Sequence, residues 1–432
     1  MHRKLKVLLI VEQCNPEWAS VPLEGFRYYT ALNRLADVTL VTHERNQSAL
    51  ARAGVEGETI VIRETRAAQF YNRIAGVLSE YRGHINWPVR HALSYPVYAE
   101  FNSRVFHQLR RPVAQGNYDI VHAFTPILPR YPVKLIEACG DTPFVLGPVN
   151  GGLSFPDGFQ AVADKEFNRF AFLRGAARFL PGYQRTYRSA DEILAGSSST
   201  LEMLRKMFAI TGDRIELLHE NGVEPEFFGN PATPRADDEL RLLFVGRLVP
   251  YKCADVVIEA VSLLSEQIRP RTTLTIVGDG PERDALERQA TALGVAGKVH
   301  FRGWVPQRQT VEHYRSSDIF CFPSVREFGG AVVLEAMASG LPCIVADYGG
   351  IAEYVTDATG FRIGLDSREH LLRQMVRRIE ELAADPELRS DMSARAVERA
   401  RKFTWDSKAH RTIEIYANLI ERKRSKDSPK SN

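Results

Sequence analysis

The feature that most constrains the fold is one strand–turn–helix–strand unit in the last third of the chain. An apolar run at 318–324 is followed by a turn that holds Glu327 and the glycine pair 329–330. The residues after this pair are small and apolar until Gly340, which is typical of a helix end, and a second apolar run occupies 343–347. Two apolar runs joined by a helix predict neighbouring parallel strands. A chain organised in this way folds as an α/β protein.

The same alternation of strands and helices runs through two successive blocks of the chain. We expect a first doubly wound parallel-sheet domain at 1–228, a turn-rich linker at 229–238 and a second such domain at 239–404. A last helix at about 405–421 precedes a charged tail at 422–432. Both domains are predicted to be Rossmann-like and to face a cleft, because ligands of such sheets bind at the carboxyl ends of the strands.

Composition excludes several other classes of protein. The chain has 432 residues, of which 44% are hydrophobic and 25% charged, which is ordinary globular chemistry. A formal net charge of +3 gives no reason to expect a nucleic-acid partner. The five cysteines are scattered, with no metal-ligand spacing, and predict reduced thiols. The apolar run at 5–11 is too short to span a membrane and lacks a cleavage site, so we expect a cytoplasmic protein.

Two glutamates in the opening unit are the first candidate site residues. Glu327 lies in the turn, and Glu335 lies about two helical turns further on, with the small Ala331 one turn before it. Backbone amides at a helix N-terminus, next to glycines, suit an anion, whereas a carboxylate suits hydroxyl groups. A ligand with both phosphates and sugars would use all of these parts. The alternative is that Glu327 complements the helix dipole and that Glu335 is solvated.

Two cations follow the first strand of the second block. Arg247 comes directly after the strand 242–246, and Lys252 lies five residues later. An arginine can hold a pyrophosphate bidentately, and a lysine acts as a point charge, so the pair can neutralise a diphosphate. The alternative is a pair of ordinary surface cations.

These motifs together resemble those of a known family. The residues that carry the resemblance are Glu327-Phe328-Gly329-Gly330, the run from Glu335 to Pro342, and Gly246-Arg247 with Lys252. They resemble the donor site of the retaining nucleotide-sugar glycosyltransferases of the "group 1" family, also called family 4. The resemblance implies the two-domain GT-B fold, with the C-terminal helix crossing back to the first domain. Cys253 stands where the family usually has a glycine.

The resemblance also implies roles for individual residues. Arg247 and Lys252 would bind the diphosphate and stabilise it as it leaves, Glu335 would accept hydrogen bonds from the ribose, and Glu327 would lie near the transferred sugar. The further donor-binding positions are Gly25, Val305, Phe328, Gly329, Gly330 and Ala331. Asn150 and Gly151 would lie on the acceptor side. The common family form has paired glycines where this chain has Glu24 and Gly25.

His122 is the remaining catalytic candidate, because it ends the apolar strand 119–121 of the first domain. Histidine is the usual proton carrier, so it could assist the acceptor. The alternative, which position alone favours, is a packed and hydrogen-bonded histidine. Many relatives have a second histidine two residues later, where this chain has Phe124.

The expected function is transfer of a sugar from a nucleotide-diphosphate sugar to a saccharide or a lipid-linked saccharide, with retention of configuration. Bacterial cell-surface polysaccharide or glycoconjugate biosynthesis is the expected setting. We expect no cofactor and no metal, because Arg247 and Lys252 can supply the charge that a divalent cation supplies elsewhere. Two alternatives stay open: a sugar-nucleotide epimerase of the same fold, and a non-catalytic protein that binds sugar nucleotides.

Two basic, aromatic segments of the first domain bear on location. They span 66–111 and 165–188 and carry many more arginines and lysines than acidic residues. Such segments suit an anionic surface, so we expect peripheral association with the inner face of the cell membrane. The alternative is a set of helices whose aromatic residues pack inward and whose charges are solvated.

Overall fold

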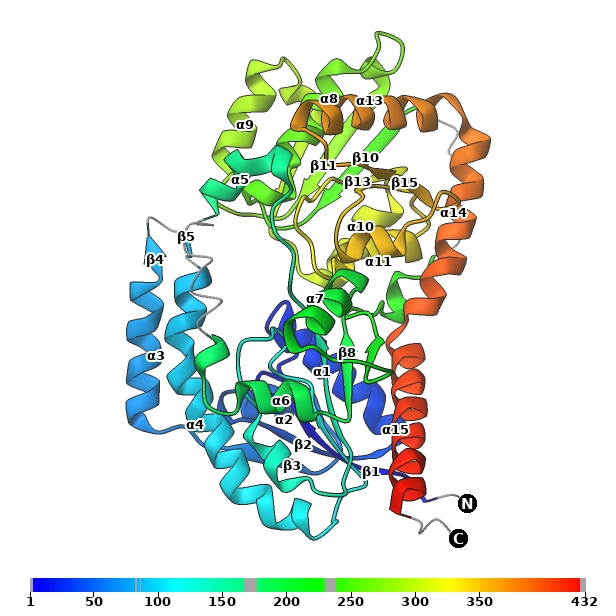
Figure 1. Ribbon diagram of the computed structural model, residues 1–432. Coiled ribbons are helices and arrows are strands. Elements are labelled where there is room, and N and C mark those ends of the chain that lie inside the picture. Colours follow the sequence, from blue (N-terminus) through cyan, green and yellow to red (C-terminus); the bar gives the residue numbers. More distant parts are fainter. Residues whose placement is uncertain (1–2, 82–83, 86, 167–176, 230–237, 428–432) are drawn as a thin grey trace. The chain divides into compact units, whose positions relative to one another are not determined.

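The computed structural model describes residues 3–81, 84–85, 87–166, 177–229 and 238–427 (Figure 1). The chain forms two compact units. Unit 1 comprises Met1–Gly152, Arg169–Glu220 and Trp405–Asn432, and unit 2 comprises Leu153–Asn168 and Asn221–Thr404.

Unit 1 is built on a seven-stranded parallel sheet in the order β3-β2-β1-β6-β7-β8-β9. Its strands are β1 (Lys6–Ile10), β2 (Asp37–His43), β3 (Thr59–Ile62), β6 (Ile120–Ala123), β7 (Phe144–Val149), β8 (Glu192–Ala195) and β9 (Ile215–Leu217). A short antiparallel pair, β4 (Glu80–Tyr81) and β5 (His84–Ile85), lies apart from this sheet. The central strand β1 is buried over Val7–Ile10, as expected for a run of Val, Leu and Ile covered on both faces.

The helices of unit 1 include a C-terminal element that is distant in sequence from the rest. The helices are α1 (Val21–Leu35), α2 (Gln47–Arg52), α3 (Arg66–Leu78), α4 (Trp87–Ala114), α6 (Tyr183–Ser189), α7 (Ser198–Phe208) and α15 (Trp405–Asp427). Helix α15 packs along α1, and the hydroxyls of Tyr28 and Thr412 lie 2.8 Å apart between them (Figure 1). Unit 1 is thus closed by the last helix of the chain.

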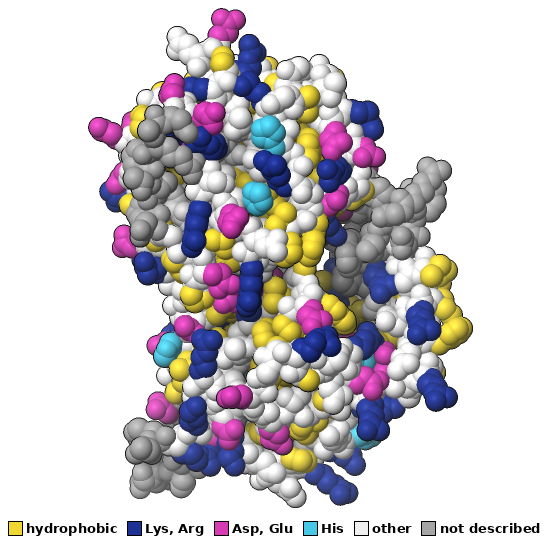
Figure 2. Space-filling view, turned by 180° about the vertical axis from the view of Figure 1, so that it is seen from behind, with side chains coloured by type: hydrophobic (Ala, Val, Ile, Leu, Met, Phe, Trp, Pro, Cys, Tyr) yellow, Lys and Arg dark blue, Asp and Glu magenta, His cyan; other side chains and the backbone are white. Residues whose placement is uncertain are grey.

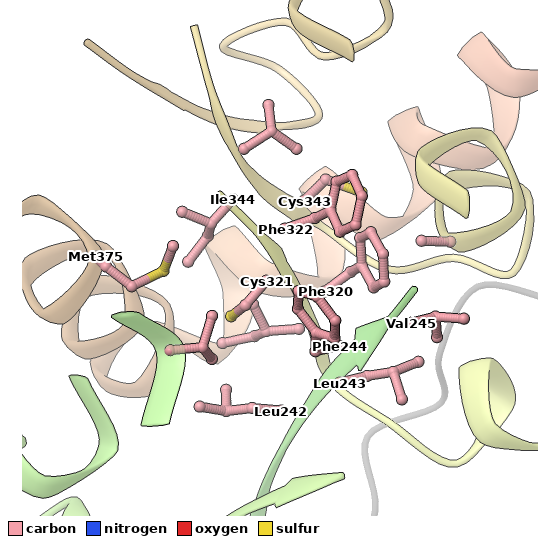
Figure 3. Packing of buried hydrophobic residues seen from close by; sticks show 14 of the residues in the cluster. Leu242, Leu243, Phe244, Val245, Phe320, Cys321, Phe322, Cys343, Ile344 and Met375 are labelled. Atoms are coloured by element: carbon pink, nitrogen blue, oxygen red, sulfur yellow. The ribbon is translucent and has the colours of Figure 1, made fainter. Parts of the chain in front are cut away.

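Unit 2 is built on a six-stranded parallel sheet in the order β12-β11-β10-β13-β14-β15. Its strands are β10 (Leu240–Val245), β11 (Thr272–Val277), β12 (Val299–Gly303), β13 (Ile319–Phe322), β14 (Cys343–Ala346) and β15 (Gly360–Ile363). The helices are α5 (Gln160–Lys165), α8 (Ala254–Leu263), α9 (Arg283–Ala292), α10 (Gln307–Arg315), α11 (Ala331–Ala338), α12 (Gly350–Tyr354), α13 (Arg368–Ala384) and α14 (Pro386–Ala400). Phe244 and Phe322 pack with ring centroids 5.6 Å apart in the core shown in Figure 3.

The prediction of two Rossmann-like parallel-sheet domains is confirmed, but the units differ from the predicted ranges. The segment 153–168 belongs to unit 2, because Phe155 and Phe159 are buried in the core of that unit. Residues 221–228 also belong to unit 2. The predicted linker at 229–238 lies mostly outside the described residues. Helix α15 continues to Asp427, so the first part of the expected charged tail is helical. In the described part of the chain, no helix is long and apolar enough to cross a membrane.

Candidate functional site

The turn between β13 and α11 has the backbone that its glycines predict. Gly330 adopts a φ of 67° in the left-handed region, and α11 begins at the next residue, Ala331. A Cβ atom at Gly330 would lie 2.3 Å from Cγ2 of Ile351, so a side chain would clash there. The first amides of α11 therefore begin directly after a residue that must be glycine.

Glu327 and Lys252, which belong to two separate sequence motifs, contact each other at this turn. Lys252 ends a 3-10 helix (Pro250–Lys252) after β10, and its ammonium forms an ion pair with the Glu327 carboxylate. The two side chains keep 12% and 16% of their surface exposed, so the pair is accessible at its edge. Ser324 Oγ lies 3.4 Å from the same carboxylate, and Lys252 Nζ lies 4.7 Å from the centroid of the Phe322 ring. Because β10 and β13 are neighbours in the sheet, their following loops bring Lys252 and Glu327 together.

Arg247 lies at the same end of β10, and its guanidinium is exposed. Its Nη2 donates a hydrogen bond of 3.2 Å to the hydroxyl of Tyr251, a residue that the sequence motifs did not single out. Cys253, where the family usually has glycine, adopts a φ of 53° in the left-handed region and is buried. The chain therefore keeps the backbone of a glycine position with a small side chain, at some cost in strain.

Glu335 is buried, so the alternative that it is a solvated helix residue is wrong. Only 4% of the residue is exposed, and its carboxylate accepts hydrogen bonds from Gln307 Nε2 and from the hydroxyl of Tyr314, the latter at 2.9 Å. Gln307 and Tyr314 both lie on α10, and the sequence motifs gave no signal for either. These two bonds fix the orientation of the carboxylate on α11.

Arg326 is a further residue that the motifs missed, and it orders the loop before α11. Its Nε donates to the carbonyl of Leu153 at 3.2 Å. The guanidinium lies over the rings of Phe155 and Phe328, at 5.0 and 5.4 Å from their centroids. Burial lowers the pKa of this arginine. Phe328, one of the predicted donor-binding positions, is thereby held in place by a stacked cation.

A second glycine pair supports the same loop from β14. The amide of Gly350 donates to the carbonyl of Glu327 at 3.1 Å, and a Cβ at Gly349 would lie 2.1 Å from that carbonyl oxygen. The remaining predicted positions nearby are Gly329, which is buried, and Val305, which packs partly buried against the core of unit 2. The side chain next to Val305, Trp304, is 71% exposed.

His122 is a packed residue, and we withdraw it from the candidate catalytic residues. It is fully buried in unit 1, with its Nε2 at 2.7 Å from the carbonyl of Gly147 and its Nδ1 bonded to the hydroxyl of Tyr416. The carbonyl can only accept, so Nε2 carries the proton and Nδ1 accepts from Tyr416. Burial lowers the pKa of His122 to about 4 although the bond to Gly147 opposes this shift. Both ring nitrogens are engaged, which leaves none to carry a proton for a ligand.

The other predicted residues of unit 1 are also packed. Gly25 lies inside α1, and a Cβ there would lie 2.6 Å from Cγ1 of Val11. Asn150 is 1% exposed, and the amide of Gly151 donates to Thr200 Oγ1 at 3.2 Å. The acceptor-side and donor-side roles of these three residues stay predictions.

Close to Asn150, unit 1 buries a group of charged residues. Burial, and then the neighbouring Glu24, raise the pKa of Glu220 well above its usual value. Lys408 of α15 donates to the backbone carbonyl of Glu220, and burial lowers the pKa of its ammonium to about 7. No set of three or more His, Cys, Asp or Glu side chains suited to a metal ion occurs among the described residues of either unit.

Comparison with known proteins identifies the family. Residues 29–227 match the family described as Glycosyltransferase Family 4, and residues 230–399 match the one described as Glycosyl transferases group 1. The chain belongs to these family 4, group 1 glycosyltransferases, as its motifs predict.

Curated relatives and solved structures agree with this assignment. D-inositol 3-phosphate glycosyltransferases of Streptomyces scabiei and Kribbella flavida are 32% and 30% identical over 260 and 261 residues, 56% and 57% of this chain. These matches span 56% and 60% of the relatives, so the chain spans a little over half the length of the curated relatives it matches.

Among solved structures, WaaG, a glycosyltransferase involved in lipopolysaccharide biosynthesis, has a TM-score of 0.58 at 19% identity, over 95% of this chain and 99% of its own. HepE of Anabaena, solved in complex with UDP, has a TM-score of 0.62 at 16% identity, over 96% of this chain and 100% of its own. At these identities the likeness shows the fold, which is GT-B.

Proposed function

We propose that the protein transfers a sugar from a nucleotide-diphosphate sugar to a saccharide or lipid-linked saccharide, without a cofactor or a metal ion. The observation that carries the proposal is the ion pair of Lys252 and Glu327 beside Arg247, at the strand ends where α11 begins. Cations, helix amides and a carboxylate in one place suit a ligand that has both a diphosphate and a sugar.

The ion pair suggests how the two charges are used. A diphosphate that contacts Lys252 competes with Glu327 for the ammonium, and the Glu327 carboxylate is then able to accept hydrogen bonds from the transferred sugar. Arg247 adds a second cation on the same strand end. Charge that develops on the departing diphosphate is stabilised by these groups, which are already in place before the reaction.

The bond changes then follow a retaining course. The bond between the anomeric carbon and the diphosphate oxygen breaks, and its electron pair stays on that oxygen. The acceptor hydroxyl attacks the same carbon on the face that the diphosphate vacates, and its proton passes to a phosphate oxygen. Because His122 has both nitrogens engaged in unit 1, this course has the further merit of needing no histidine base.

Glu335 is the proposed partner of the ribose. Tyr314 and Gln307 hold its carboxylate in one orientation, and a fixed carboxylate can accept hydrogen bonds from a vicinal diol. The complex of HepE with UDP supports a uridine nucleotide as the first donor to test. The names of the relatives, which act on an inositol phosphate or in lipopolysaccharide biosynthesis, support a saccharide-type acceptor, in keeping with cell-surface polysaccharide or glycoconjugate biosynthesis.

A cytoplasmic location with peripheral association at an anionic membrane surface belongs to the same proposal. Of the two segments that suggested it, 165–188 is described only in part, because 167–176 lie outside the described residues. The segment 66–111 includes α3 and most of α4, and the structural support for membrane association comes from this segment.

A screen of nucleotide sugars tests the function and separates its alternatives. Thermal shift with a panel of donors should find one that stabilises the chain, and that donor should release its nucleotide only slowly unless a saccharide acceptor is present. An epimerase would convert the donor with no acceptor, and a non-catalytic binding protein would be stabilised without releasing nucleotide. Either result would overturn the proposal.

Stereochemistry tests the proposed course of the reaction. With an α-linked donor, we expect proton NMR to show an α-linked product as the first product formed. A β-linked product at early times would contradict the same-face attack, because inversion needs a base on the opposite face.

A further inference from the structure

Helix α3 of unit 1 turns its large apolar side chains toward solvent. Phe70 is 65% exposed, Val77 75% and Leu78 66%, and Ile74 is 39% exposed. These positions follow one another at the spacing of a single helix face. They make up four of the ten large hydrophobic side chains that are exposed in the described residues, although the helix has only 13 residues.

The opposite face of α3 is the one that packs, and its residues are small or polar. Ala75 is 1% exposed, and Gly76 comes so close to α4 that a Cβ there would lie 2.8 Å from Nη1 of Arg90. A surface helix normally buries its large apolar side chains and exposes its polar ones. Here the small residues allow a close approach to α4, and the apolar stripe is left on the outside.

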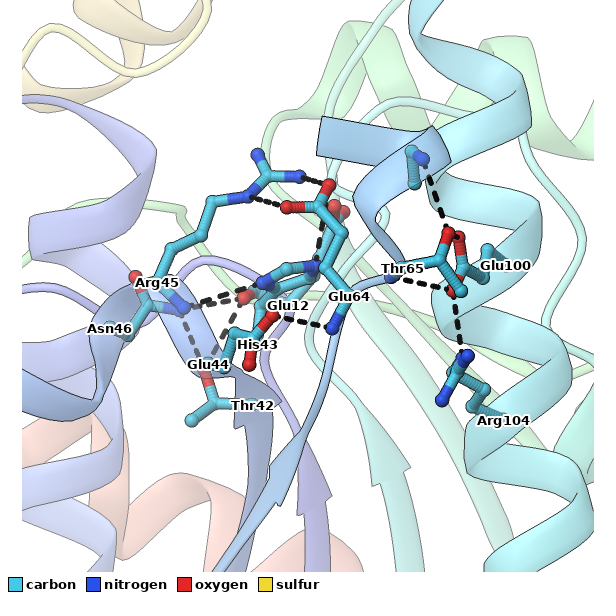
Figure 4. Close-up of polar contacts among 11 residues, drawn as sticks. Glu12, Thr42, His43, Glu44, Arg45, Asn46, Glu64, Thr65, Glu100 and Arg104 are labelled. Atoms are coloured by element: carbon cyan, nitrogen blue, oxygen red, sulfur yellow. Dashed lines mark hydrogen bonds and ion pairs between the residues drawn. The ribbon is translucent and has the colours of Figure 1, made fainter. Parts of the chain in front are cut away.

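The N-terminus of α3 is fixed, so the stripe is presented by a well-anchored helix. Thr65 caps the helix by accepting from the amide of Ala68 at 3.1 Å, and its own hydroxyl donates to Glu100 of α4 at 2.9 Å (Figure 4). Glu100 also accepts from Arg104 at 2.8 Å. The apolar stripe therefore does not result from a helix that has swung away from its support.

The charges beside the stripe are positive. Arg66 and Arg73 are exposed, one helical turn before Phe70 and Val77 respectively, and residues 65–79 contain no acidic side chain. The acidic residues next to the helix start are already paired, Glu64 with Arg45 and Glu100 with Arg104 (Figure 4). Figure 2 shows hydrophobic side chains with Lys and Arg side chains beside them along the edge of the molecule that carries α3.

We infer that α3 is the element that binds an anionic membrane surface, with its apolar stripe in the boundary between headgroups and acyl chains. This rests on the peripheral association proposed above and names its site. An exposed apolar stripe flanked by arginines matches a surface that offers both anionic headgroups and hydrocarbon. A second copy of the chain is a poorer occupant, because a twofold contact sets a patch against its own copy and would bring arginines together.

Vesicle flotation of the full chain tests this inference. Wild type should float with vesicles that contain phosphatidylglycerol and much less with phosphatidylcholine vesicles, and binding should fall with salt. Replacing two apolar residues, Phe70→Ser with Val77→Ser, should weaken binding about tenfold or more, since each side chain loses its burial. Arg66→Gln and Arg73→Gln should each weaken it about fivefold, which corresponds to ~1 kcal/mol per arginine near an anionic surface.

Matched controls lie on unit 2. Leu263 and Leu293 are also exposed, at 55% and 38%, so Leu263→Ser with Leu293→Ser removes two exposed apolar side chains elsewhere. This pair should leave flotation unchanged. Circular dichroism and thermal melting of each variant check that it is folded. The proposed transferase activity is measured separately, as nucleotide released from the donor in the presence of a water-soluble acceptor. Loss of flotation with that activity intact separates the two proposals.

A cysteine labelled with a fluorophore gives a second measurement, which reports on the bound state directly and does not depend on weakening the binding. All five native cysteines are buried, so Val77→Cys offers an exposed thiol for an environment-sensitive fluorophore. Its emission should shift to the blue on anionic vesicles only. Flotation that is unchanged in the Phe70/Val77 variant, or a label on residue 77 that does not respond, would overturn the inference. So would a dimer in light scattering that the same substitutions dissociate while flotation persists.

Discussion

The two units carry sheets with similar strand orders, yet their strand ends are used differently. In each sheet the first strand lies between the second and a later strand, β1 beside β6 in unit 1 and β10 beside β13 in unit 2. After β10 and β13, Lys252, Glu327 and Arg247 keep part of their surface exposed. Within β6, one residue before the strand ends, His122 is fully buried and bonded at both nitrogens.

This difference shows that polar residues at strand ends have two distinct roles. In unit 2 the charges are arranged toward solvent, where a ligand can replace one partner of an ion pair. In unit 1, buried polar groups bind the C-terminal helix: His122 of β6 bonds to Tyr416, and the backbone carbonyl of Glu220, after β9, accepts from Lys408. The first set is suited to chemistry, and the second fastens the last helix of the chain to its sheet.

The largest expected effect is the loss of turnover when either cation of unit 2 is removed. Arg247→Ala and Lys252→Ala should each lower turnover by about 10²–10³, because each removes a charged contact to the leaving diphosphate. The melting temperature should change little. Arg288→Ala, which removes an exposed arginine on α9, is the matched control and should turn over normally. Normal turnover of either site variant would break the assignment of catalysis to unit 2.

A second effect separates the two glutamates of unit 2. Glu335→Gln should weaken binding of the nucleoside diphosphate by about tenfold, since it removes a charge-assisted bond, while Glu327→Gln should mainly lower turnover. Glutamine keeps an oxygen for the Tyr314 hydroxyl, which alanine would leave buried without an acceptor. Calorimetric titration with the diphosphate alone, together with initial rates, measures both. Equal loss of affinity in the two variants would contradict the division of roles.

The sequence predicted the part of this site that lies in short motifs. The Glu327 turn, the Gly330 helix start and the two cations could be placed at strand ends because strand and helix runs fix where those ends fall. Tyr314 and Gln307 could not, because α10 is a mostly polar helix whose contacts depend on how it packs against α11. That residues 153–168 belong to unit 2 likewise depends on tertiary packing, because Phe155 and Phe159 are buried in the core of that unit.

Helix α3 shows a further limit of sequence patterns. Its apolar residues form one stripe, and such a stripe predicts an amphipathic helix but not which side faces the protein. That side is decided by the small residues Ala75 and Gly76, which allow α4 to approach. The same limit applies to His122, whose predicted position at a strand end is compatible with a catalyst and with a packed residue. The structure decides between them, because Gly147 and Tyr416 are the hydrogen-bond partners of its two ring nitrogens.

A third prediction tests the fastening role in unit 1. His122→Ala should lower the free energy of unfolding by about 2–4 kcal/mol, because it leaves the Gly147 carbonyl and the buried Tyr416 hydroxyl without a partner. Turnover per folded molecule should stay unchanged. His410→Ala, an exposed histidine on α15, is the control. A loss of turnover in His122→Ala at full folding would return this residue to the candidate catalytic residues.

The pH dependence of that variant sharpens the same test. The pKa of His122 is lowered from 6.5 to about 4, so between these values the unfolded chain binds a proton that the native chain does not. This group therefore lowers wild-type stability as the pH falls from 6.5 through 4, by roughly 3 kcal/mol in all. Urea unfolding across this range should show a steeper loss for wild type than for His122→Ala. Parallel curves would mean that the histidine titrates freely.

The smallest expected effect is that of a chelator. If Arg247 and Lys252 carry the charge of the departing diphosphate, a divalent cation has little left to neutralise, and turnover in excess chelator should equal turnover with added Mg²⁺. The comparison becomes sharper in Lys252→Ala, where one cation is gone and Glu327 loses its partner. A metal ion could then gain a ligand, so added Mg²⁺ or Mn²⁺ should restore part of the rate in that variant while leaving wild type unchanged. Loss of wild-type turnover in chelator, with recovery on adding a divalent ion, would show that the two cations of unit 2 do not suffice for the leaving group.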